Sequence, residues 1–323
     1  MKWLAISLSF VSLILLLSYA AGLLGTGNYV SNYEYDEFDS GNTFLGPTLI
    51  TDNLAVYIVG EGEPILVFPY PHAGTHEPMA QSDFSDTFIA LDRKVITFDV
   101  PGTYASTREP KVDMNEMLDC AIDALEAAGV DGRIDVAGHS MGGLVALAFS
   151  LEYPERVDQL LLVNTLSGFD ASLKWGMPGS AWTWNQKEYW QLMYWGIRLQ
   201  NGRGDLAMHK RLMHLMREAS FVDKSFVPPL EIDDDDRDTP TPVRFRWSKA
   251  LWDINFAEEL GRVKASTLVT AGRYDPQTPI ECAQELTEGI PNNKLVVFEN
   301  SGHYPFVEEE ERFLDVVGSF LRK

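Results

Sequence analysis

Short apolar runs and helical patterns alternate along most of the chain. Seven runs have the length and composition of buried strands, and they cover residues 54–59, 65–68, 94–100, 134–137, 160–163, 267–271 and 294–298. Helical periodicity follows several of them, over residues 113–128, 143–153, 280–289 and 308–321. Strands that alternate with helices favour a mostly parallel sheet with helices on both faces, so the expected fold class is α/β.

The first two apolar runs flank the turn Gly60-Glu61-Gly62-Glu63-Pro64. A glycine-rich turn between two apolar runs predicts a β-hairpin, which would open the sheet. Further along, Asp113 is a suitable N-cap for the helix over 113–128, and Gly129 is a suitable stop.

The alternation stops over residues 168–256. Helical patterns within this stretch cover 186–199 and 206–219, and an acidic run covers 231–238. Asp233–Asp236 within this run are expected to lie in a solvated loop rather than to bind a cation. Seven of the eight tryptophans also lie here, at Trp175, Trp182, Trp184, Trp190, Trp195, Trp247 and Trp252. The stretch is therefore expected to be an insertion into a core made of residues 48–167 and 257–323.

The N-terminal residues 3–24 carry no charge and follow Lys2. This pattern predicts a secretory signal peptide, with Ser18-Tyr19-Ala20 as a cleavage site, or an N-terminal membrane anchor; a buried helix is the remaining reading. The apolar run is long for a signal peptide, which favours the anchor. In the first two cases the folded domain is expected to be membrane-anchored or secreted, outside the cytoplasm, and residues 25–47 are a spacer.

The chain has 47 acidic and 26 basic residues, and its net charge is −21. Such a balance excludes binding of nucleic acid through a broad basic face, because no such face can be built. Cys120 and Cys282 lie in helical patterns without metal-site spacing, so we expect buried free thiols.

Candidate chemistry begins directly after the strand at 134–137, where Gly138-His139-Ser140-Met141-Gly142 matches the pattern G-x-S-x-G. A strand-to-helix turn of this kind admits only small flanking residues and holds the serine hydroxyl above the end of the sheet. The run Gly-His-Ser-Met-Gly-Gly resembles the nucleophile turn of the α/β-hydrolase superfamily, and this variant is common in its lipase, esterase and serine-aminopeptidase branches.

Two later loops resemble the remaining catalytic loops of that superfamily. Asp275 lies in Gly272-Arg273-Tyr274-Asp275-Pro276-Gln277-Thr278-Pro279, and His303 lies in the loop after residues 294–298. The chain order Ser140, Asp275, His303 is the order of this fold, and each residue follows a predicted strand. The resemblance implies that Ser140 is the nucleophile, His303 the general base and Asp275 the acid that orients it, with no cofactor or metal.

The resemblance also implies an oxyanion hole made by the backbone N–H of Met141 and the loop over residues 69–74. If Pro69 takes the usual histidine position, Pro71 falls where the donor belongs, and proline has no N–H. Tyr70, through its backbone or its phenol, and His72 with Gly74 are the alternatives. His72 and His76 in this loop are not expected to bind metal. Residues 99–108 resemble a structural turn of the superfamily, so neither Asp99 nor Ser106 is expected to be catalytic.

In this superfamily an insertion at this point of the chain forms a helical cap over the serine, so the resemblance implies a cap made by residues 168–256. Its tryptophans either pack the cap against the core or line an apolar pocket, and Trp182, Glu188 and Trp190 are candidate contacts to a small acyl substrate. His209 and His214 lie on different helix faces, which disfavours zinc. The favoured function is hydrolysis of a carboxylic ester. The alternatives are a serine aminopeptidase of the prolyl-iminopeptidase type with Glu188 binding the free amino terminus, carbon–carbon hydrolysis, and a tethered binding module without turnover.

Overall fold

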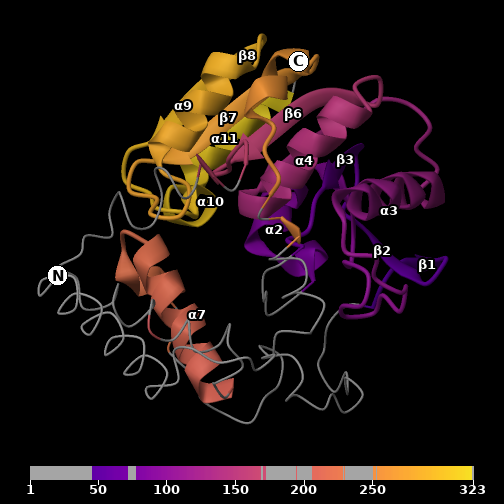
Figure 1. The fold of residues 1–323 in the computed structure, drawn as a ribbon, viewed down its shortest axis with the longest axis horizontal. Helices are drawn as coiled ribbons and strands as arrows, with labels where there is room; N and C mark the ends of the chain where they lie inside the picture. Colours follow the sequence, from indigo (N-terminus) through magenta and orange to yellow (C-terminus); the bar gives the residue numbers. More distant parts are fainter. Residues whose placement is uncertain are drawn as a thin grey trace, which may run out of the picture.

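The computed structural model describes residues 46–71, 78–168, 170–171, 194, 206–227, 229, 250–251 and 253–321. Within them an eight-stranded sheet has the order β1-β2-β4-β3-β5-β6-β7-β8 (Figure 1). Its strands are β1 Leu49–Thr51, β2 Leu54–Val59, β3 Glu63–Val67, β4 Arg93–Phe98, β5 Ile134–His139, β6 Val157–Val163, β7 Ser266–Gly272 and β8 Asn293–Phe298. Only the pairings of β2 with β1 and with β4 are antiparallel, so the mostly parallel α/β sheet is confirmed.

The predicted hairpin between residues 54–59 and 65–68 is wrong, because β4 lies between β2 and β3. Gly60 and Gly62 have φ values of 83° and 95°, which glycine adopts without strain. A Cβ on Gly62 would lie 2.0 Å from the carbonyl oxygen of Asp92, and one on Gly60 would lie 2.6 Å from that of Arg93. The turn therefore passes against the start of β4 and places β2 and β3 on its two sides.

Helices cover both faces of the sheet because side chains alternate along its strands. Leu66 faces a core shared with α3 Met114–Ala127, α4 Ser140–Glu152 and α9 Ile280–Gly289. Val67 faces the opposite core, shared with α2 Asp83–Ala90, α10 Pro305–Glu308 and α11 Glu310–Leu321. The described elements also include short 3₁₀ turns at Met79–Gln81, Lys224–Phe226 and Ala257–Arg262, and the helix α7 Leu206–Ser220.

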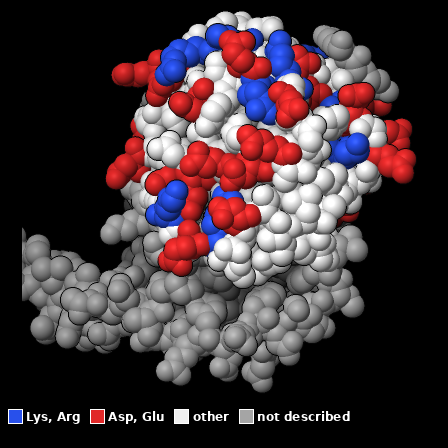
Figure 2. Space-filling view, turned by 90° about the vertical axis from the view of Figure 1, so that its right-hand side faces the viewer, with Lys and Arg blue, Asp and Glu red and all other residues white. Residues whose placement is uncertain are grey.

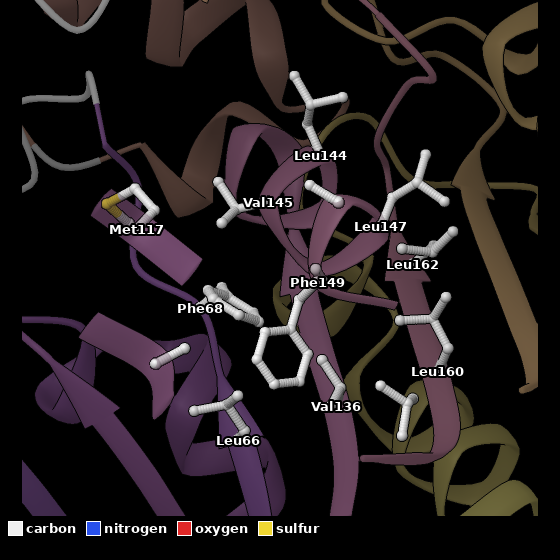
Figure 3. Packing of buried hydrophobic residues seen from close by; sticks show 14 of the residues in the cluster. Leu66, Phe68, Met117, Val136, Leu144, Val145, Leu147, Phe149, Leu160 and Leu162 are labelled. Carbon is white, nitrogen blue, oxygen red and sulfur yellow. The ribbon is translucent and has the colours of Figure 1, made fainter. Parts of the chain in front are cut away.

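The central helix α4 is buried on all sides, from Met141 to Leu151. Figure 3 shows its side chains packed among those of β5 and β6 and against Phe68, which follows β3. The rings of Phe68 and Phe149 lie 5.5 Å apart between centroids. Burial of one such ring contributes about 1.5–3 kcal/mol, so the helix that starts at Ser140 has a fixed position.

The helix termini follow local signals in the sequence. The Asp113 carboxylate accepts a hydrogen bond from the N–H of Glu116 at 2.8 Å, and Gly129 beyond the end of α3 has a φ of 71°. Both cap predictions are confirmed. The helix expected over 308–321 is divided into α10 and α11 at Glu309, whose carboxylate accepts hydrogen bonds from the N–H of Asn300 and the hydroxyl of Ser301.

Cys120 and Cys282 are buried free thiols, as predicted. Burial raises the pKa of each to about 12, so both stay protonated at neutral pH. Figure 2 shows a band of acidic side chains across one face, with lysine and arginine side chains gathered near the top of the view and a few more below the band.

Several predicted segments lie outside the described residues, among them 1–24, nearly all of the spacer 25–47 and most of 168–256. Of the insertion, α7 is described and matches the helix predicted over 206–219; Figure 1 shows it lying off the sheet. In the part of the chain that is described, no helix is long and apolar enough to cross a membrane.

Candidate active site

The turn between β5 and α4 holds Ser140 in a left-handed backbone conformation, with a φ of 53°. A Cβ on Gly138 would lie 2.3 Å from the carbonyl oxygen of Gly142, and one on Gly142 would lie 2.7 Å from that of Phe68. Only hydrogen fits at these two positions, which explains the glycines of the motif. This backbone conformation costs about 1–3 kcal/mol for a residue other than glycine, and the packing around the turn has to offset that cost.

Thr165, two residues after β6, supports this turn. Its hydroxyl donates to the carbonyl oxygen of Ser140 at 2.6 Å, and a Cβ on Gly143 would lie 2.6 Å from the Thr165 side chain. The first turn of α4 is thus held against the end of β6. Nothing in the local pattern around Thr165 pointed to this contact.

The loops after β7 and β8 bring Asp275 and His303 together. Asp275 Oδ2 lies 2.7 Å from His303 Nδ1, and both residues are only 2% exposed. A carboxylate can only accept, so in the neutral ring Nδ1 carries the proton and Nε2 keeps its lone pair. The pairing predicted for these two residues is therefore present, and it leaves Nε2 of His303 able to accept a proton.

Four further hydrogen bonds keep Asp275 ionised. Its Oδ2 accepts from the Thr278 hydroxyl at 2.6 Å and from Asn164 Nδ2 at 2.8 Å, and its Oδ1 accepts from the N–H groups of Gln277 and Thr278. Burial by itself would raise the pKa of Asp275, but the charge of His303 and the hydrogen bonds lower it below its usual value. The site thus holds a buried carboxylate of fixed orientation.

Asn164, directly after β6, joins the two loops and was missed in the sequence. Its φ is 43°, and its Nδ2 donates to Asp275 and, at 3.0 Å, to the carbonyl oxygen of Gly302. Its Oδ1 is buried without a hydrogen-bond partner. A sequence signal for it exists, because a polar residue directly after a buried parallel strand lies at the edge of the sheet where ligands bind in open α/β sheets.

The loop of His303 is also held from the side of α7. The N–H of His303 donates to the carbonyl oxygen of Ser220, the last residue of α7, at 2.7 Å. Glu308 accepts from the N–H groups of Val222 and Asp223 through Oε1 and from that of Gly302 through Oε2. The sequence pattern does not predict these contacts, because they join segments that are far apart in the chain.

Part of the predicted oxyanion site is described. Met141 lies in the first turn of α4, where backbone N–H groups have no partner within the helix. The close approach of Gly142 to Phe68 and Pro69 places the start of the 69–74 loop beside this turn. The Tyr70 hydroxyl lies 2.5 Å from Nδ1 of His139, while His72 and Gly74 are outside the described residues.

The turn over residues 99–108, which follows β4, is hydrogen-bonded to β2. The Tyr57 hydroxyl donates to Asp99 Oδ2 at 2.9 Å, and the Ser106 hydroxyl donates to the Asp99 carbonyl oxygen at 2.9 Å. Burial, followed by the Asp99 charge, raises the pKa of Tyr57. Asp99 and Ser106 thus take part in hydrogen bonds that hold this turn against β2.

The candidate substrate contacts Trp182, Glu188 and Trp190 lie outside the described residues, as do His72 and His76. Among the residues that are described, no group of three or more His, Cys, Asp or Glu side chains is placed to hold a metal ion.

Comparisons with known proteins identify the family and the fold. Residues 76–310 match the sequence profile of the alpha/beta hydrolase fold. The chain is 31% identical over 210 residues to a pimeloyl-[acyl-carrier protein] methyl ester esterase of Nitrosomonas europaea, covering 61% of this chain and 77% of that protein. It is 26% identical over 305 residues to a 2-hydroxy-6-oxo-6-phenylhexa-2,4-dienoate hydrolase of Comamonas testosteroni, covering 89% of this chain and 99% of that protein.

Solved structures give the same fold. An alpha/beta fold family hydrolase from Bacillus anthracis is similar with a TM-score of 0.68 at 20% identity, over 82% of this chain and 94% of that one. A meta-cleavage product hydrolase from Pseudomonas fluorescens is similar with a TM-score of 0.60 at 22% identity, over 83% of this chain and 94% of that one. The relatives support hydrolysis as the class of reaction, and the chain belongs to the alpha/beta hydrolase fold family.

Proposed function

We propose that this chain is a serine hydrolase that cleaves a carboxylic ester through an acyl-enzyme on Ser140. The observation that carries the proposal is the buried hydrogen bond between Asp275 and His303, which leaves Nε2 of His303 as the available base. Ser140 lies at the start of α4 with a left-handed φ. Its neighbour His139 has its ring centroid 4.6 Å from that of His303, so nucleophile and base come from adjacent parts of the site.

In the proposed first step, Nε2 of His303 takes the hydroxyl proton of Ser140 while Oγ attacks the ester carbonyl. The Asp275 carboxylate stabilises the imidazolium that forms. The N–H of Met141, together with a donor from the 69–74 loop, binds the oxyanion, and one such donor typically contributes about 3–4 kcal/mol. His303 then gives its proton to the departing alcohol, and the acyl group stays on Ser140.

In the proposed second step, water replaces the alcohol. His303 takes a proton from the water as hydroxide attacks the acyl carbonyl, and the collapse of the second tetrahedral intermediate returns a proton to Ser140 and releases the acid. The same groups therefore act twice, and no residue beyond the site needs to change its charge. An ester is favoured because the relative with 31% identity is a methyl ester esterase.

A second candidate function is hydrolysis of a carbon–carbon bond beside a ketone. It is favoured by the relative from Comamonas testosteroni, a hydrolase of 2-hydroxy-6-oxo-6-phenylhexa-2,4-dienoate, since the similarity extends over 99% of that protein. The same nucleophile and base would serve this reaction, but the leaving group would be a carbon atom rather than an oxygen atom. Substrate choice therefore decides between the two functions.

The test is a substrate panel on the full chain, with Ser140→Ala as the control. It contains p-nitrophenyl esters of increasing acyl length, aminoacyl p-nitroanilides including proline, and 2-hydroxy-6-oxo-6-phenylhexa-2,4-dienoate. Ester turnover that disappears in Ser140→Ala supports the proposal, and its dependence on acyl length measures the pocket. Turnover of the dienoate alone favours the second candidate, and turnover of aminoacyl amides alone indicates an aminopeptidase. Ester turnover that persists in Ser140→Ala contradicts the proposed nucleophile.

A further inference from the structure

His139, the residue before Ser140, is a buried histidine that the proposed mechanism does not use. It ends β5 and is 1% exposed. Its imidazole is surrounded by other rings, with centroid distances of 4.6 Å to His303, 5.0 Å to Phe306, 5.5 Å to Tyr304, 5.6 Å to Tyr70 and 5.8 Å to Phe84. A phenylalanine would fill such a pocket at least as well, so packing alone does not explain why position 139 is a histidine.

Both ring nitrogens of His139 have partners, and these fix its tautomer. Nε2 lies 2.8 Å from the carbonyl oxygen of His303, which can only accept, so Nε2 carries a proton. Burial, and then the charge on His303, lower the pKa of His139 well below its usual value, so the ring is neutral. A neutral imidazole has one N–H group, so Nδ1 accepts from the Tyr70 hydroxyl, 2.5 Å away.

The hydrogen bonds therefore run in one direction, from the hydroxyl of Tyr70 to His139 and from His139 to the main chain of His303. They join the loop after β3, the end of β5 and the loop after β8. On its other side, the N–H of His303 donates to Ser220. The main chain of His303 is thus held at both its N–H and its carbonyl group, while Asp275 holds its side chain.

The neutral state of His139 also suits the charge that develops nearby. His303 becomes an imidazolium during the proposed reaction, and the two ring centroids are 4.6 Å apart. A second positive charge at this distance inside the protein would oppose that step. The Tyr70 hydroxyl, by donating to Nδ1, stabilises the neutral tautomer.

We propose that His139 is a positioning residue, which fixes the main chain of His303 relative to Ser140, and that Tyr70 selects the tautomer of His139 required for this. The inference rests on the proposed roles of Ser140 and His303. It also assigns the phenol proton of Tyr70 to His139 rather than to an oxyanion.

Two substitutions of His139 separate positioning from packing. His139→Phe keeps an aromatic ring but removes the donor to His303. His139→Gln loses the ring, yet its side-chain amide nitrogen can occupy the place of Nε2 and donate to the same carbonyl oxygen. Tyr70→Phe removes only the hydroxyl. All three are made in the full chain, with turnover of a p-nitrophenyl ester normalised to the serines titrated by a fluorophosphonate.

We expect His139→Phe to lower kcat by about 100-fold with little change in KM, because misplacement of a catalytic group by about 1 Å has an effect of this size. His139→Gln should recover most of this loss, and Tyr70→Phe should lower kcat by about 10-fold, the effect of about 1.4 kcal/mol. If His139→Phe keeps the wild-type kcat per titrated serine, or is more active than His139→Gln, the ring serves packing alone and the proposal is overturned.

A second readout does not depend on turnover. Long-range ¹H–¹⁵N correlation spectra of the protein labelled at its six histidines report which nitrogen of each ring carries the proton. We expect His139, assigned by its loss in His139→Gln, to be protonated at Nε2 only. Protonation at Nδ1 would overturn the proposal, even in a preparation without ester turnover. An inactive wild type with the expected tautomer would instead count against the proposed function.

Discussion

Asn164 provides a prediction whose size can be worked out from the structure. Substitution by glycine removes a hydrogen bond to the Asp275 carboxylate and one to the carbonyl oxygen of Gly302. A hydrogen bond to a charged group contributes about 1.5–3 kcal/mol and one to a neutral group about 0.5–1.5 kcal/mol. The substitution also removes the buried, unpaired Oδ1, which costs the wild type about 1–3 kcal/mol. The net loss of stability for Asn164→Gly should therefore be about 1 kcal/mol.

Asn164→Ala should be less stable than Asn164→Gly, although alanine usually gives a more stable protein than glycine at the same position. Residue 164 has a φ of 43°, where a Cβ atom costs about 1–2 kcal/mol. Thr278→Val is the matched control, because it removes one hydrogen bond to the same carboxylate oxygen without removing an unpaired atom. It should cost about 1.5–3 kcal/mol, more than Asn164→Gly, although fewer hydrogen bonds are lost.

Urea unfolding gives the free energies, and ester turnover per titrated serine gives the effect on catalysis. Asn164→Gly should lower kcat by about 10-fold, since Asp275 then orients His303 with one donor fewer. An Asn164→Ala variant as stable as Asn164→Gly would refute the predicted cost of a Cβ atom at this position. A wild-type kcat in both variants would refute the predicted effect on catalysis.

Three further predictions concern the frame around the site. Gly143→Ala places a Cβ 2.6 Å from Thr165 and should destabilise the chain by about 1–3 kcal/mol in urea unfolding, while Gly132→Ala, with open space around it, should change stability by less than about 0.5 kcal/mol. Glu308→Ala removes the acceptor of three N–H groups, so it should lower the free energy of unfolding by about 1–3 kcal/mol and lower kcat as well. An unchanged kcat would mean that the contacts at the end of α7 do not affect the position of His303. Folding lowers the pKa of Asp275, so the ionised carboxylate stabilises the folded chain above its unfolded pKa of about 3.9, and this stabilisation is lost as the pH falls through the folded pKa. The urea midpoint of the wild type should therefore decrease over this pH range. The midpoint of Asp275→Asn, which lacks the titrating group, should decrease less.

Local patterns predicted most of the elements and the turn at Ser140. The strand before Ser140, the helix after it and the cap at Asp113 depend on residues that are neighbours in the chain, and all are present. Asp275 and His303 were found because each follows a strand in a recognisable loop, and their hydrogen bond follows from the parallel order of β7 and β8.

Long-range contacts set the features that were missed. The pattern around Gly60 is that of a hairpin, and only the insertion of β4 between β2 and β3 excludes one. Similarly, His139 was identified as part of the turn, but its role depends on Tyr70 and on a carbonyl group 164 residues away. A histidine in an apolar setting gives no sign of its partners until the loops that carry them are in place.

The most direct test of the account is site-specific labelling of the full chain by a fluorophosphonate, read by peptide mass spectrometry. We expect one phosphonate on the peptide that contains Ser140 and none in Ser140→Ala. In His303→Gln we expect labelling to be slower by about 10²–10⁴-fold, the usual contribution of a general base. A wild type that is not labelled would contradict the serine hydrolase and favour a binding module without turnover. Labelling of Ser140 at the same rate in His303→Gln would contradict His303 as the general base.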